Sequence, residues 1–78
     1  MKIETDQTDK QLVSLLTALM ETRRGCVYDG ITAARFFSEN WGIYADHHVY
    51  TSIMDQMTRY EKAVIVEPGG YTKFMIVP

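Results

Sequence analysis

The polar side chains between residues 46 and 62 carry most of the chemistry that this sequence offers. If Ile53 lies on the inner side of a helix, eight side chains point outward or to the flanks: His47, His48, Thr51, Ser52, Asp55, Thr58, Arg59 and Lys62. Hydroxyl and imidazole groups donate and accept hydrogen bonds, and arginine and lysine attract anions. This segment is therefore a candidate surface for binding a large polar partner.

The sequence indicates binding rather than catalysis. It contains no glycine-rich phosphate loop and no combination of nucleophile, base and orienting acid at a recognisable spacing. The single cysteine, Cys26, precedes a short apolar stretch, which favours a small buried side chain over a nucleophile. His47 and His48 could bind a metal ion with Asp46 or Cys26, but successive helix positions diverge by about 100°. We therefore expect no enzyme activity, no cofactor and no metal.

Apolar periodicity predicts two helices in the first half of the chain. Thr8-Asp9-Lys10-Gln11 has the form of a capping box. The first helix then buries one stripe, Leu12, Leu15, Leu16, Leu19 and Met20, and closes at Gly25. After a β-prone stretch at residues 26–28, Thr32 can cap a second helix from Ala33 to Trp41. That helix is expected to bury Phe36, Phe37 and Trp41 and to end at Gly42, with Ile43 returning to the core.

A third helix and a hairpin follow. Asp46 is the expected N-cap, and the buried face is predicted to be Val49, Ile53, Met57 and Tyr60, with Tyr50 and Met54 at its margins. The β-prone runs 63–67 and 71–77 flank Pro68-Gly69-Gly70, which is typical of a turn. The second run is apolar on both faces, so we expect it to be covered.

This order of elements resembles the winged helix-turn-helix superfamily. GITAARFF at residues 30–37, closing with Trp41-Gly42-Ile43, looks like the second helix and turn of such domains. VYTSIMDQM at residues 49–57, followed by Val64-Ile65-Val66 and Gly70-Tyr71, is similar to their recognition helix and wing. The likeness covers about residues 8–77. It implies an α+β domain at residues 8–78 with three helices and a small antiparallel β-sheet, preceded by a flexible arm at residues 1–7.

The resemblance also implies a function, in which the third helix enters the major groove of double-stranded DNA. The residues expected to read base edges are His47, His48, Thr51, Ser52 and Asp55. Those expected at the DNA backbone are Thr32, Arg35, Arg59, Lys62 and Lys73. The predicted protein is a small sequence-specific transcriptional regulator of the size that prophages, plasmids or compact operons encode.

The charge balance leaves a second function open. The formal net charge is −2, whereas nucleic-acid-binding domains usually carry a basic surplus. Glu4, Asp6 and Asp9 lie in the leading arm, and from Lys10 onward seven basic residues balance seven acidic ones. Winged helices also serve as docking modules for proteins. The alternative is therefore a protein-binding adaptor or inhibitor without DNA binding, for example a phage-type protein that occludes a host protein.

Other patterns concern location and assembly. No apolar run approaches the roughly 18–20 residues of a membrane span, and residues 1–6 are too polar for a signal peptide. A single cysteine does not indicate an oxidising compartment, so we expect a cytoplasmic protein. Trp41 and the apolar run 71–77, together with the first helix, exceed what so small a monomer needs to bury and predict a homodimer.

Overall fold

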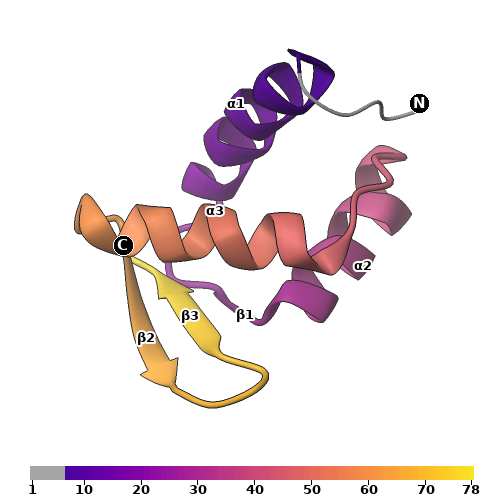
Figure 1. Ribbon diagram of the computed structural model, residues 1–78. Helices are drawn as coiled ribbons and strands as arrows, with labels where there is room; N and C mark the ends of the chain where they lie inside the picture. The colour runs from indigo at the N-terminus through magenta and orange to yellow at the C-terminus, as the bar shows by residue number, and fades with distance from the viewer. Residues whose placement is uncertain (1–6) are drawn as a thin grey trace.

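The computed structural model describes residues 7–78, which form three helices and a three-stranded antiparallel sheet (Figure 1). In chain order the elements are α1 (Gln7–Glu21), β1 (Val27–Tyr28), α2 (Gly30–Trp41), α3 (His47–Arg59), β2 (Ala63–Glu67) and β3 (Lys73–Ile76). The sheet order is β1-β3-β2. This is the predicted α+β class, in an arrangement compatible with a winged helix.

The three helices surround a common core, and the β2–β3 hairpin extends from the carboxyl end of α3 (Figure 1). The core contains Leu12, Leu16 and Met20 from α1, as the sequence predicts. Leu15, predicted on the same face, is exposed, because α1 buries a single row of residues at a spacing of four. Among residues 7–78 no helix is long and apolar enough to cross a membrane.

The start of α1 differs from the prediction. The helix already includes Gln7, so Thr8 lies inside it and does not precede it as a cap. The arm expected at residues 1–7 otherwise lies outside the described residues. At the other end, α1 stops at Glu21, before the predicted closing residue Gly25, which adopts the left-handed backbone conformation with φ +81°. The Gly25 amide donates to the carbonyl of Ile76 at 2.7 Å, which ties the end of the α1 segment to β3.

The start of α2 lies earlier than predicted. Asp29, not Thr32, is the N-cap, and Thr32 occupies the third helical position. The Asp29 carboxylate accepts a hydrogen bond from the Thr32 amide at 2.7 Å, while the Asp29 amide donates to the Thr32 hydroxyl at 2.9 Å. This reciprocal pair satisfies two amides at once, which favours the earlier start over a cap at Thr32 alone. Gly42 ends the helix as predicted, with φ +66°.

Fewer side chains of α2 are buried than the sequence predicts. Phe37 is fully buried and Phe36 is half-buried, but Trp41, predicted to be inside, is 53% exposed. The chain leaves the helix at Gly42 immediately after Trp41, and Ile43 fills the core position instead. The prediction for Ile43 is confirmed, and the prediction for Trp41 is wrong.

The buried face of α3 is rotated relative to the prediction. Tyr50 and Met54, expected at its margins, are fully buried beside Ile53 and Met57. Tyr60, expected inside, lies beyond the last helical residue and is 67% exposed. The rotation places the ring of Tyr50 parallel to that of Phe37, with centroids 5.4 Å apart and an interplanar angle of 4°.

The sheet contains a covered strand and an open one. β3 lies between β1 and β2, and its residues Phe74 and Ile76 are buried, whereas Lys73 is exposed and Met75 is half-buried. The second strand is therefore covered on one face, and the prediction of cover on both faces is wrong. β2 is an edge strand with three consecutive exposed apolar residues, Val64, Ile65 and Val66. An apolar edge strand of this kind is unusual for an isolated monomer.

Candidate nucleic-acid interface

The amino-terminal end of α3 is fixed by its cap. Asp46 has an extended backbone (φ −63°, ψ 144°), and its carboxylate accepts a hydrogen bond from the His48 amide at 2.9 Å. That hydrogen bond, with smaller contributions from the two neighbouring imidazoles, lowers the pKa of Asp46 below its usual value. The predicted cap is therefore confirmed, and it sets where the first residues of α3 point.

A close contact with α2 holds the same end of α3. A Cβ atom added to Gly30 would lie 2.5 Å from the carbonyl oxygen of His47 and would also meet the Thr51 hydroxyl. The absence of a side chain at Gly30 therefore lets the two helices approach this closely. The Thr51 hydroxyl donates to that same carbonyl at 3.1 Å. Thr51 thus lies at the contact between helices, and it is half-buried rather than fully outward as predicted.

The solvent-facing side of α3 carries most of the predicted site. His48, Ser52, Asp55 and Arg59 are exposed along it, and His47 is half-buried. Gln56 is exposed as well, but it lines a groove between α1 and α3 and not the side that carries these residues. The difference at Thr51 arises from the rotation of the helix, which moves position 51 toward α2. The apolar spacing of residues 50, 53, 54 and 57 is the signal that could have identified this rotation.

Each of three predicted backbone-binding cations lies beside a carboxylate. The shortest pair joins Lys62 Nζ to Glu21 Oε2 at 3.0 Å, and Arg59 Nη2 lies 3.5 Å from Asp55 Oδ2. Lys73 Nζ on the hairpin lies 3.9 Å from Glu67 Oε2. Exposed pairs of this kind contribute little to stability and exchange readily with other ions. They do, however, bring the local charge of the surface close to zero.

The remaining predicted contacts lie on α2. Arg35 is exposed there, one turn beyond Thr32. Thr32 is also exposed, but its hydroxyl accepts from the Asp29 amide and lies 3.2 Å from the Asp29 carbonyl. The carboxylate of Asp29 occupies the first turn of the helix, where an anion would otherwise meet free amides. Arg35 is therefore the better placed of the two for a phosphate.

A groove separates α3 from the tip of the hairpin. It has a volume of about 370 Å³ and is lined by both α2 and α3 and by the turn of the hairpin: Gly30, Ile31, His47, His48, Thr51, Gly70, Tyr71 and Thr72. The predicted base-reading residues at the start of α3 thus face the wing across an open space. Tyr71 is one of the most exposed aromatic side chains among the described residues.

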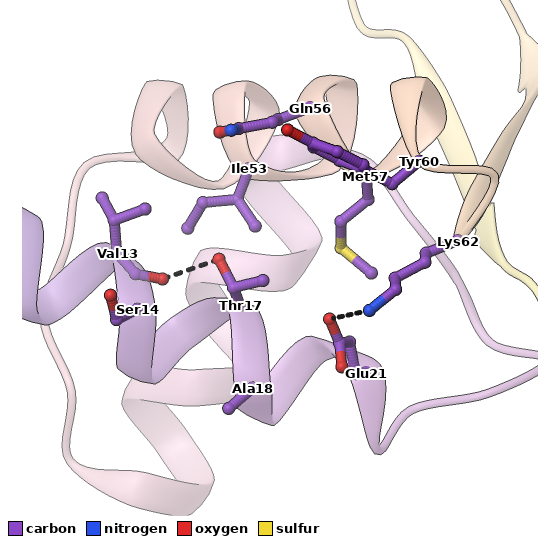
Figure 2. A pocket seen from close by; sticks show the side chains of 10 residues that line it. All are labelled: Val13, Ser14, Thr17, Ala18, Glu21, Ile53, Gln56, Met57, Tyr60 and Lys62. Carbon is purple, nitrogen blue, oxygen red and sulfur yellow. Dashed lines mark hydrogen bonds and ion pairs between the residues drawn. The ribbon is translucent and has the colours of Figure 1, made fainter.

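A second groove runs between α1 and α3, away from this surface (Figure 2). It has a volume of about 530 Å³, and Val13, Ile53 and Met57 supply apolar side chains to its walls. The Glu21–Lys62 ion pair stands at one end (Figure 2). Lys62, predicted to contact DNA, therefore points toward α1 rather than along the solvent-facing side of α3.

Comparison with known proteins gives no relative of this chain: no family model, no curated protein and no solved structure matches it.

Proposed function

We propose that this chain is a small sequence-specific regulator that binds double-stranded DNA and catalyses no reaction. The observation that carries the proposal is the two-sided character of α3. Its inner face, with Tyr50, Ile53 and Met54, belongs to the core, and its outer face from His48 to Arg59 is open to solvent. The major groove of B-DNA is about 12 Å wide and admits one α-helix. A free helical face beside a hairpin suits this mode of binding.

Individual side chains have separate roles in this proposal. His48 and Ser52 are exposed hydrogen-bonding groups that can read base edges. His47 and Thr51 lie deeper and limit how closely the duplex approaches. Arg35 neutralises a phosphate, and Arg59 and Lys73 do so once their exposed carboxylate partners are displaced. Asp55 accepts a hydrogen bond from cytosine.

The proposal includes a cytoplasmic homodimer. Two copies would present two α3 helices, which read half-sites about one turn of DNA apart. Exposed apolar residues at Trp41 and along β2 are available to a second copy. Dimerisation also doubles the number of phosphate contacts, which offsets the weak electrostatics of one domain.

The test is the salt dependence of binding to duplex DNA. Three phosphate contacts per chain predict a slope of about −2.7 for log affinity against log salt, counted per domain. Arg59→Ala should reduce this slope by about 0.9. Arg24→Ala is the matched control, because Arg24 is exposed but follows α1, away from the outer face of α3. A slope near zero, or equal effects of the two variants, would contradict the proposal.

A second candidate function is a protein-binding adaptor or inhibitor without DNA binding. The observation that favours it is the pairing of Arg59, Lys62 and Lys73 with acidic side chains, next to an exposed apolar β2. Pulldown from host lysate separates the two candidates. A protein partner that survives nuclease treatment and is lost with Ile65→Asp supports this second function. Retention that nuclease abolishes supports DNA binding.

A further inference from the structure

A cluster at the turn before α3 brings three potential metal ligands together. One nitrogen from each imidazole of His47 and His48 and one carboxylate oxygen of Asp46 all lie within 4.8 Å of one another. The two imidazole rings have centroids 4.0 Å apart, and His47 Nε2 lies 3.9 Å from Asp46 Oδ1. Two imidazoles and a carboxylate form a donor set that suits Zn²⁺ and its neighbours.

The three ligand atoms come together at the start of α3 although successive helix positions diverge by about 100°. His47 and His48 are the first two residues of α3, and their side chains turn so that the ring centroids lie 4.0 Å apart. Asp46 precedes the helix with an extended backbone, and His47 is its first residue. The carboxylate therefore folds back over the first turn, and the two rings tilt toward each other with an interplanar angle of 44°. Three consecutive residues can thus serve one ion.

The backbone beneath the cluster is held in place. The carbonyl of His47 packs against Gly30 and accepts the Thr51 hydroxyl, and the Asp46 carboxylate accepts the His48 amide. A carboxylate has about four lone-pair positions, so the capping bond leaves others free for a metal. The side chains themselves can adjust, because Asp46 and His48 are exposed. A site on a fixed backbone loses less entropy when it closes around an ion.

The distances require a modest contraction. Ligand atoms bound to Zn²⁺ at about 2.0–2.1 Å in tetrahedral geometry stand about 3.3 Å apart. The present spacing of up to 4.8 Å can close by rotation of the exposed side chains. The positive end of the α3 dipole opposes a cation, and the charge of Asp46 counters it. These opposing effects favour a micromolar affinity rather than the tight binding of an enclosed structural zinc site.

We propose that Asp46, His47 and His48 form a binding site for a borderline divalent transition-metal ion such as Zn²⁺. His47 and His48 also line the groove beside Ile31 and Tyr71, from which water or a group of a partner could complete the coordination. The ion would lock the turn between α2 and α3 and fix both imidazoles. The proposal does not depend on DNA binding, because it concerns the free chain.

The test is titration of the full chain with Zn²⁺ by calorimetry and with Co²⁺ by visible absorption, without DNA. The wild type should bind one ion per chain with micromolar affinity. His47→Gln and His48→Gln should each lose about tenfold or more in affinity. Asp46→Asn should also weaken binding while it keeps the helix cap, since asparagine caps as well as aspartate. Far-ultraviolet circular dichroism checks that each variant remains folded.

Cys26→Ser is the matched control, because Cys26 is the single cysteine of the sequence and a thiolate is a strong ligand for the same ions. Its affinity should equal that of the wild type. The proposal is overturned if the wild type shows no saturable binding, if the histidine variants bind as the wild type does, or if loss follows Cys26→Ser alone. It is also overturned if one histidine variant loses affinity and the other does not.

Discussion

α3 is held by its two helical neighbours in different ways. Against α2 the backbones approach closely at Gly30, and the ring of Phe37 lies parallel to that of Tyr50 at 5.4 Å. Against α1 a row of apolar side chains meets the core, but an open groove of about 530 Å³ remains along the contact (Figure 2). We infer that α2 positions the amino-terminal half of α3, where the candidate metal ligands and most of the candidate base-reading residues lie. α1 mainly covers the core.

Phe37→Ala, at the contact between α2 and α3, should cause the largest loss of stability. The side chain is fully buried between α2 and α3, so its loss leaves a cavity and removes the contact with Tyr50. We expect the free energy of unfolding to fall by about 4 kcal/mol, measured by urea denaturation. Trp41→Ala on the same helix is the control and should cost far less, because Trp41 is mostly exposed. Similar losses for the two variants would mean that burial on α2 is not as described.

Gly30→Ala should cause the next largest loss of stability. The added Cβ would meet the His47 carbonyl at 2.5 Å and the Thr51 hydroxyl, so α2 and α3 must separate. Alanine favours a helix over glycine by about 1 kcal/mol, but overpacking costs more, and we expect a net loss of about 2 kcal/mol. Gly70→Ala is the control, since an added Cβ there meets nothing within 4 Å. If Gly30→Ala is as stable as its control, the close approach of the two helices is refuted.

Tyr50→Phe should stabilise the same contact. The Tyr50 hydroxyl is buried and has no hydrogen-bond partner among the described residues. Its removal should raise the free energy of unfolding by about 1 kcal/mol, because an unsatisfied buried hydroxyl is costly. Burial also raises the pKa of Tyr50 from 10.0 to about 12.

The raised pKa adds a pH test to this variant. Above pH 10 the folded chain keeps a proton on Tyr50 that the unfolded chain releases, so stability should fall as the pH rises from about 10 to about 12. Tyr50→Phe should remove that part of the decline. Parallel pH profiles for the two proteins would show that the hydroxyl has a partner or reaches water.

Local patterns explain how much of the fold could be predicted from the sequence. The order of helices and strands follows from apolar spacing and from turn residues such as Gly42 and Asp46, whose effects extend over only a few neighbours. The rotation of α3 was missed although its buried residues, Tyr50, Ile53, Met54 and Met57, have regular helical spacing. The spacing of Val49, Ile53, Met57 and Tyr60 is equally regular. The choice between them depends on Phe37, which is distant in the sequence.

The candidate site could also be predicted only in part from the sequence. Most exposed positions of α3 could be predicted from one helical projection, but the rotation leaves His47, Thr51 and Thr58 half-buried. The charge pairing could not be predicted fully, because Lys62 meets Glu21 across 41 positions of the chain. The approach of His47 and His48 was missed because a projection places Cβ atoms and does not give the side-chain rotamers that bring the rings together.

Ala18→Leu should change the stability of the fold least, and it tests the contact between α1 and α3. Ala18 is exposed and lines the groove between α1 and α3, so a larger side chain meets open space rather than packed atoms. We expect the free energy of unfolding to change by no more than about 0.5 kcal/mol. The same enlargement at Ala33, which is fully buried on α2, should destabilise the fold by about 2 kcal/mol through overpacking. A large loss for Ala18→Leu would mean that the groove closes in solution, and α1 would then constrain α3 as firmly as α2 does.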